Sequence, residues 1–183
     1  MTTYTGLVTL VQLSAGILGD RNRMSYDAGI SYIRNVFEAT RTLQKNPDDL
    51  DARGIIMMGA SLSTSSRLGI GKEEPFAYEI YELEFLPEKL FGSSYRRSLT
   101  SVFPRFLQAM GKHHADDIRK YYHDSFGIDS SIEESSRKLV ELFEGFGVEM
   151  YYDGKITREQ VDAIPCHTEL SKEEVFDIIN SLI

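Results

Sequence analysis

The chain has 183 residues and a net charge of −8, with apolar and charged fractions of 42% and 26%, values that are typical of a globular protein. The acidic balance argues against a nucleic-acid partner, because Arg96 and Arg97 form the only conspicuous basic pair. Cys166 is the single cysteine, which excludes an intrachain disulfide and fits a reducing compartment.

The first segment, residues 6–18, is apolar enough to suggest a signal peptide. No Lys or Arg precedes it, however, and thirteen residues are too few to span a bilayer. Its apolar residues instead follow a helical period, with one face formed by Leu7, Leu10, Val11, Ser14, Ile17 and Leu18. We therefore predict a core helix, no membrane partner and a cytoplasmic location.

The next segments keep this helical spacing of apolar residues. A second helix is predicted to end near Asn46-Pro47 and a third to begin at Asp51. Their apolar residues are Ile30, Ile33, Val36, Phe37 and Leu43, followed by Ile55, Ile56 and Leu62. A fourth helix is predicted over residues 75–90. A fifth closes before Gly127 and presents Phe103, Phe106, Leu107, Met110, His114, Ile118 and Tyr121 on one face.

Three later helices begin with a capping-box pattern, in which a hydroxyl and a Glu or Gln side chain satisfy each other's free backbone N–H groups. The boxes are Ser130–Glu133, Thr157–Gln160 and Ser171–Glu174, and an apolar stripe of Ile132, Leu139, Leu142, Phe143 and Phe146 follows the first. Residues 148–152 are the only strand candidate. The pattern predicts an all-α, single-domain helical bundle over residues 1–183.

Few residues have the spacing that a known chemistry requires. His113 and Asp117 would share one helical face and could begin a metal site, but a closed zinc site needs four ligands. We favour a salt-bridged surface formed with Lys112, Arg119 and Lys120, with His114 turned toward the core. Cys166-His167 has no visible orienting partner, so we interpret Cys166 as a free thiol rather than a nucleophile.

Two glycine- and hydroxyl-rich stretches are also better explained by packing than by chemistry. The cluster Ser61, Ser63, Thr64, Ser65 and Ser66 lacks the Gly-x-Ser-x-Gly elbow of a serine hydrolase. The segment 68–72 lacks the spacing of a phosphate-binding loop and no predicted strand precedes it. We expect close helix packing at the first stretch and a chain turn at the second.

The order of these segments resembles that of the iron-containing alcohol dehydrogenases, of the butanol dehydrogenase or aldehyde reductase type. The likeness covers roughly residues 20–183 and rests on "DARGIIMMGASLSTSSRLGIGK", "LTSVFPRFLQAMGK", "FGVEMYYDGKITREQVDAI" and "LSKEEVFDIINSLI". Asp51 and Arg53 match the D-x-R element of the family. Its G-x-G-K turn and its apolar-Pro element are matched by Gly69, Gly71 and Lys72 and by Phe103-Pro104.

The resemblance implies a fold of the dehydroquinate synthase-like type, in which a C-terminal helical domain holds a divalent metal through one Asp and three His. An N-terminal α/β domain would bind NAD(P)H, and the metal would polarise the carbonyl that receives the hydride. This sequence departs from that pattern. It has no Gly-Gly pair for a dinucleotide site, and residues 1–19 contain no Asp, Glu or His for the first two metal ligands.

The other two metal ligands are also replaced. Alignment of Phe76-Ala77 with the aromatic-Ala pair of the family places Glu79 at the third ligand and Leu83 at the second His of that motif. The fourth ligand falls at Tyr95, or at a neighbouring serine, Ser93 or Ser94, if the gap moves. We therefore expect no metal, no cofactor and no catalytic residue, with Glu79 and Tyr95 as former ligand positions.

These observations favour a non-catalytic, stand-alone helical domain that binds another protein or a second copy of itself. Its expected interface or pocket consists of Tyr78, Glu79, Tyr81, Glu82, Leu83, Phe85, Phe91 and Tyr95, with Tyr121 and Tyr122 nearby. Two alternatives stay open. The chain could be the helical subunit of a split NAD(P)H-dependent alcohol dehydrogenase or aldehyde reductase, or a small-molecule binding domain that uses the old substrate pocket.

Overall fold

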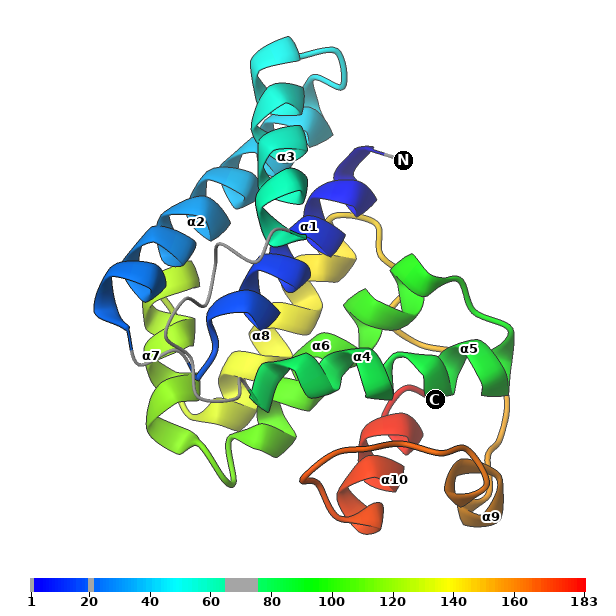
Figure 1. Cartoon of the computed structure of the whole chain (residues 1–183). Helices are drawn as coiled ribbons and strands as arrows, with labels where there is room; N and C mark the ends of the chain where they lie inside the picture. The colour runs from blue at the N-terminus through cyan, green and yellow to red at the C-terminus, as the bar shows by residue number, and fades with distance from the viewer. Residues whose placement is uncertain (1, 20–21, 65–75) are drawn as a thin grey trace. The chain divides into compact units, whose positions relative to one another are not determined.

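A computed structural model of the chain describes residues 2–19, 22–64 and 76–183 (Figure 1). Within these ranges every regular element is a helix, so the all-α prediction is confirmed. The predicted turn at Gly69, Gly71 and Lys72 and the hydroxyls of Ser65 and Ser66 lie outside the described residues.

The chain divides into two compact units, each with its own internal packing. Unit 1 comprises Met1–Tyr78 and Lys120–Ile128, and unit 2 comprises Glu79–Arg119 and Asp129–Ile183. The single domain over residues 1–183 stays a prediction. Each unit is described by itself below.

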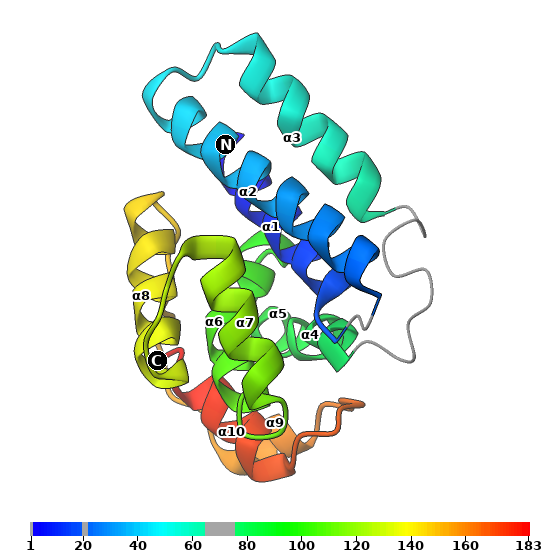
Figure 2. The ribbon, with the colours of Figure 1, turned by 90° about the vertical axis from the view of Figure 1, so that its left-hand side faces the viewer.

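Unit 1 is built on three long helices that pack pairwise: α1 (Thr2–Ile17), α2 (Arg23–Lys45) and α3 (Leu50–Ser63). They lie side by side in Figure 2. The predicted N-terminal core helix is confirmed, because α1 buries Leu7, Leu10, Val11, Ser14, Ile17 and the adjoining Leu18. No helix in the described ranges is long and apolar enough to cross a membrane.

Two glycines bring α1 and α2 close together. A Cβ atom added to Gly29 of α2 would lie 2.2 Å from Cγ2 of Ile17, a fully buried side chain of α1. A Cβ added to Gly6 would lie 2.1 Å from Oγ1 of Thr40, which is also buried. The two helices therefore approach over both ends of α1 at a distance that only glycine permits.

The second half of α7 (Ala115–Phe126) completes unit 1. Its Tyr121 hydroxyl lies 2.6 Å from Ser14 Oγ, and the ring of Phe126 meets that of Phe37 edge to face at 5.6 Å. Tyr121 and Tyr122 are 0% and 1% exposed. These two tyrosines belong to the core and cannot form the surface that the sequence suggested.

Unit 2 is centred on α6 (Tyr95–Met110), whose residues 98–107 are all buried. Four helices pack on α6: α4 (Ile80–Leu83), α5 (Phe85–Phe91), α8 (Ile132–Gly145) and α10 (Lys172–Asn180). The short α9 (Arg158–Asp162) packs on α10 and α5. Pro104 lies inside α6, where its carbonyl accepts a 2.7 Å hydrogen bond from Ser136 of α8.

The fourth helix predicted over 75–90 is divided into three pieces: the 3-10 turn η1 (Phe76–Glu79), α4 and α5. The break at Glu84 has a local cause. Pro87 has no backbone N–H to donate to the carbonyl four residues earlier, at Leu83, so one regular helix cannot run through this point.

The predicted fifth helix is wrong in its middle, because α6 and α7 are separate helices joined by residues 111–114. The chain turns after Met110, whose carbonyl accepts from the backbone N–H groups of both His113 and His114. Gly111 lies against Ile132, with only 2.7 Å available for a Cβ. His113 is therefore not on the same helical face as Asp117, as the sequence spacing suggested.

Two of the three predicted capping boxes are confirmed, at Thr157–Gln160 and Ser171–Glu174. At the third, the N-cap of α8 is Ser131, one residue after the predicted Ser130. Ser131 Oγ accepts from the N–H of Glu134 at 3.2 Å, whereas the Ser130 hydroxyl lies 3.0 Å from that of Ser135. The engagement of Ser130 with Ser135 explains the shift.

The strand candidate at residues 148–152 is not a strand. Its side chains do alternate between buried and exposed, but Arg97 holds the segment by donating to the carbonyls of Glu149 and Tyr151. The N–H of Tyr152 donates to the carbonyl of Leu182 at 2.7 Å. Since no other strand occurs in the described parts of the chain, the segment has nothing to pair with as a ladder.

Candidate functional site

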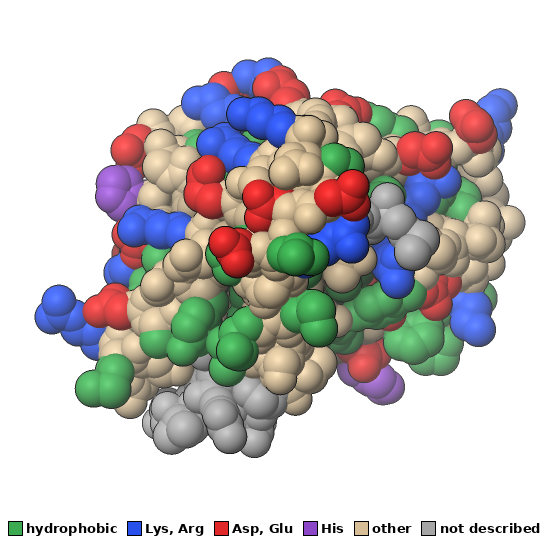
Figure 3. All heavy atoms as spheres, turned by 90° about the horizontal axis from the view of Figure 1, so that it is seen from above, with side chains coloured by type: hydrophobic (Ala, Val, Ile, Leu, Met, Phe, Trp, Pro, Cys, Tyr) green, Lys and Arg blue, Asp and Glu red, His purple; other side chains and the backbone are tan. Residues whose placement is uncertain are grey.

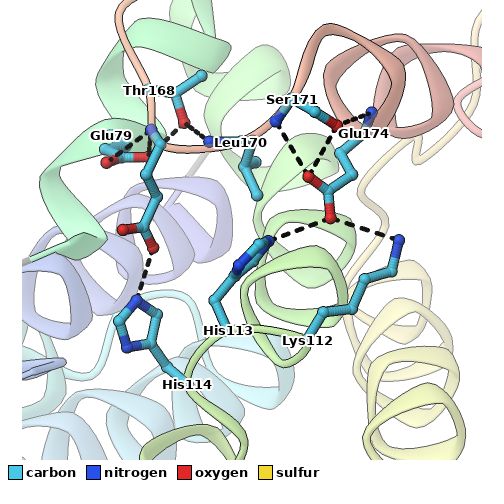
Figure 4. A network of polar contacts seen from close by, with 9 residues as sticks. Glu79, Lys112, His113, His114, Thr168, Leu170, Ser171 and Glu174 are labelled. Carbon is cyan, nitrogen blue, oxygen red and sulfur yellow. Dashed lines mark hydrogen bonds and ion pairs between the residues drawn. The ribbon is translucent and has the colours of Figure 1, made fainter.

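Glu79, one of the two former ligand positions, lies at the end of η1 in unit 2. Its carboxylate accepts the hydroxyl of Thr168, and both of its oxygens lie 3.1 Å from the backbone N–H of Glu169 (Figure 4). Thr168 Oγ1 in turn accepts from the N–H of Leu170 at 3.2 Å. Glu79 therefore fastens the loop before α10 rather than pointing into an empty site.

The same loop is fixed from a second direction by the connection between α6 and α7. His114 Nε2 lies 2.6 Å from the carboxylate of Glu169, so this side chain takes part in an ion pair when protonated (Figure 4). The His114 side chain is 30% exposed, which places it at the boundary of the core rather than inside it.

Glu174, in the first turn of α10, forms a second group of polar contacts, separate from that of Glu79. Its carboxylate accepts from the N–H and hydroxyl of Ser171 at 3.0 and 2.9 Å, and it pairs with His113 at 3.1 Å and Lys112 at 3.5 Å (Figure 4). The pKa of Glu174 is lowered to about 2, mainly by the hydrogen bond from the Ser171 N–H and also by the Ser171 hydroxyl and by His113. Glu174 thus joins the cap of α10 to the end of α6.

Replacement of Glu174 by glutamine should destabilise the protein at neutral pH. We expect Glu174→Gln to lose about 1–2 kcal/mol of unfolding free energy, since a cap and two ionic contacts depend on the charge. The folded pKa lies below the ordinary value of 4.5, so the charge stabilises above pH 4.5 and this contribution is lost as the pH falls toward 2. Urea unfolding at pH 7 and pH 3 measures the difference.

Glu173 provides the matched control in the same helical turn. Its side chain is 74% exposed, and the ion pair that it forms with Arg158 is 3.9 Å long. Glu173→Gln should change stability by less than about 0.5 kcal/mol. Equal losses in both variants, or a Glu174→Gln loss that does not shrink between pH 7 and pH 3, would contradict the role assigned to Glu174.

Cys166 lies beside two carboxylates and is half-buried. The pKa of its thiol is raised to about 11, mainly by burial and also by the negative charges of Glu82 and Glu79. Glu82 is itself engaged, because it accepts the backbone N–H of His167 at 3.3 Å. A thiol that is protonated at neutral pH is a poor nucleophile.

A divalent metal is the group that the family resemblance implies, and the residues at its expected position do not fit one. Leu83 is fully buried and offers no donor atom. Glu79 is occupied by N–H and O–H donors, and Tyr95, at the start of α6, is 38% exposed. The described residues contain no group of three His, Cys, Asp or Glu side chains placed to bind a metal.

The remaining positions of the expected interface differ in exposure. Tyr78 and Phe85 are 47% and 50% exposed. Tyr81 and Phe91 are partly buried, and Phe91 stacks on Tyr152 at a centroid distance of 4.7 Å. Any contact surface in this region of unit 2 would thus use Phe85 and Tyr95 more than Phe91.

Sequence reasoning missed one unusual acid, Glu84, between α4 and α5. Glu84 is 3% exposed and one of its carboxylate oxygens, Oε2, has no hydrogen-bond partner. The pKa of Glu84 is raised to about 8, mainly by burial and also by the neighbouring Glu88. A glutamate inside an amphipathic pattern is normally solvated, so helical spacing alone did not single out this side chain at the boundary between α4 and α5.

The fold has relatives among the solved structures. No family model and no curated protein matches the sequence. Solved structures do match. NADH-dependent butanol dehydrogenase A from Thermotoga maritima has a TM-score of 0.79 and 17% identity, over 99% of this chain and 52% of that chain.

Two further solved structures match in the same way. The aldehyde reductase of E. coli gives a TM-score of 0.75 and 16% identity, over 88% of this chain and 44% of that one. An iron-containing alcohol dehydrogenase from Corynebacterium glutamicum has a TM-score of 0.69 and 14% identity, over 100% of this chain and 52% of that chain. The chain thus spans about half the length of these proteins, and at such identities the likeness establishes the fold.

Proposed function

We propose that this chain, which has the fold of a helical half of the iron-containing alcohol dehydrogenases, is a non-catalytic module that associates with a second copy of itself. The non-catalytic role is supported chiefly by the hydrogen bonds of Glu79. Its carboxylate accepts from Thr168 and Glu169, while Leu83 contributes only packing. These residues stabilise a loop and a core at the place where a metal would have to be bound.

Self-association is supported by helix α3 in unit 1. This helix buries Ala52, Ile56 and Gly59 and leaves Leu50, Met57 and Met58 exposed at 81%, 74% and 63%. The exposed residues share one helical face with Gly54, whose missing Cβ would meet nothing within 4 Å. Figure 3 shows hydrophobic side chains exposed between charged residues on one side of the molecule.

A second copy is the occupant that this face fits best. In an antiparallel pair of α3 helices crossing at Gly54, Leu50 of one copy would face Met58 of the other, and the reverse contact would form at the same time. A two-fold interface requires this self-complementarity. Methionine side chains adapt to such a surface, and glycine at the centre allows a close crossing.

Light scattering after size-exclusion chromatography tests this proposal. The chain should elute as a dimer at high concentration, and Met57→Glu should make it monomeric because two carboxylates would be buried at the contact. Met24→Glu is the matched control, because Met24 is 82% exposed in the same unit but lies on α2. A strict monomer at all concentrations, or equal effects of both variants, would rule out the α3 interface.

The alternative of a split oxidoreductase makes different demands. It requires a separate polypeptide that supplies the NAD(P)H-binding domain, together with a metal on this chain. Stoichiometric iron or zinc in the purified protein, or NADPH oxidation with aldehydes, would favour that alternative over the non-catalytic proposal.

A further inference from the structure

The most unusual charged group in unit 2 is Arg105, in the middle of α6. Arg105 is 8% exposed, and one of its terminal nitrogens donates to the carbonyl of Ser101 at 2.9 Å. Its guanidinium carbon lies 4.9 Å from the ring centroid of Tyr151. No ion pair of Arg105 occurs in the described chain; burial lowers the pKa of Arg105, while the charge of Glu144 acts in the opposite direction.

Buried arginines are normally matched by a carboxylate, because an unpaired charge is costly to remove from water. A guanidinium has five N–H donors, and the contacts to Ser101 and Tyr151 leave several of them without a protein acceptor. Arg105 therefore has donors without a protein acceptor, and because none of its nitrogens is among the buried unpartnered atoms of the described chain, these donors are reached by solvent.

Arg105 lines two cavities. The smaller one, of about 270 Å³, is lined by Arg105, Gln108, Ala109, Lys112, Glu174, Asp177, Ile178 and Ser181. The larger one, of about 490 Å³, shares Arg105, Gln108 and Ser181 but also contains Glu133, Glu141 and Glu144. The smaller cavity is lined by two cationic and two acidic side chains, whereas the larger cavity is lined by two arginines and three acidic side chains. An anion is therefore better tolerated in the smaller cavity.

Gln108 strengthens this site. It lies one helical turn after Arg105 on α6, is exposed, and its side chain has no hydrogen-bond partner in the described structure. Its amide can donate to an anion bound at the guanidinium. The Ser181 hydroxyl, in contrast, already donates to the carbonyl of Ile178 at 2.7 Å.

We propose that the smaller cavity binds a short-chain organic monocarboxylate, with its carboxylate on Arg105 and Gln108 and its hydrocarbon tail against Ala109 and Ile178. The planar guanidinium fork matches a carboxylate through two parallel hydrogen bonds. The acids nearby, Glu174 and Asp177, disfavour ligands with a second negative charge. The volume is sufficient for a molecule of several non-hydrogen atoms. The site is independent of the α3 contact proposed above.

Isothermal titration calorimetry of the full chain with sodium butyrate tests the proposal. Butyramide is the neutral analogue of the same shape, and succinate carries the second charge. We expect saturable binding of butyrate and at least tenfold weaker binding of both analogues. No saturable binding of butyrate up to about 10 mM, or equal binding of butyramide, would overturn the proposal.

Variants of the cavity distinguish this site from weak surface binding. Gln108→Glu would place a carboxylate one turn from Arg105, where it competes inside the protein, so butyrate should bind at least tenfold more weakly. Because Gln108 is exposed, this change does not endanger the fold. Arg137→Gln is the control: Arg137 lines only the larger cavity of the two and already pairs with Glu134 and Glu141. The affinity of Arg137→Gln for butyrate should stay within twofold of that of the wild-type protein. An equal loss of butyrate affinity in both variants would contradict the assignment.

Discussion

Substitution of Gly29 by alanine should destabilise the protein by about 1–3 kcal/mol, the usual cost of an overpacked core. The added methyl group would lie 2.2 Å from Cγ2 of Ile17 and 3.3 Å from its Cβ. Ile17 is fully buried and branched close to its own backbone, so it has no free rotamer into which it can withdraw. Chemical denaturation followed by circular dichroism measures the loss.

Substitution of Gly54, in the same unit, should have the opposite effect on stability. Gly54 also lies within a helix, but a Cβ there meets no atom within 4 Å. Gly54→Ala should therefore stabilise the isolated chain by about 0.4–1 kcal/mol, because alanine loses less backbone entropy on folding. If both substitutions stabilised the protein, the close α1–α2 approach at Gly29 would be incorrect.

Glu84→Gln should stabilise the protein more as the pH rises. The folded pKa of Glu84, about 8, exceeds the ordinary value of 4.5, so the native state holds the proton more tightly than the unfolded state. The unfavourable ionisation of this buried acid therefore begins to cost stability above pH 4.5, grows to about pH 8 and then levels off. We expect a gain on the order of 1–3 kcal/mol at pH 9 and little change at pH 4.

Urea unfolding of the wild-type protein and the variant at pH 4, 6.5 and 9 measures this dependence. Glu88→Gln is the appropriate comparison, because it removes the neighbouring charge but leaves the buried carboxyl in place. It should weaken the pH dependence without abolishing it. A pH-independent difference between Glu84→Gln and wild type would show that Glu84 is solvated.

The helical class and most helix positions follow from local sequence, because apolar spacing and caps act within a few residues. α1 and the boxes at Thr157 and Ser171 are examples. The predicted helix boundaries are wrong where contacts with residues distant in the sequence determine the local structure. The turn at 111–114 depends on Gly111 meeting Ile132, from α8, and on carboxylates that lie far along the chain. The periodicity of one helix contains no information on these contacts.

The candidate site was predictable only in part. Alignment with a family motif drew attention to Glu79 and Leu83, and the structure gives each an ordinary structural role. Arg105 has no sequence signal, since one arginine inside an apolar helix pattern resembles a surface residue. Its burial depends on α8 and α10 packing around α6, which only the three-dimensional arrangement reveals.

The environment of Cys166 has a practical consequence for labelling. With a pKa of about 11, only about one thiol in ten thousand is ionised at pH 7, and half of the side chain is shielded. A cysteine introduced at a fully solvated position of α3 would react with a maleimide probe far faster than the native one. Spin labels or fluorophores could therefore be attached singly to the wild-type background, and the separation between two copies measured directly.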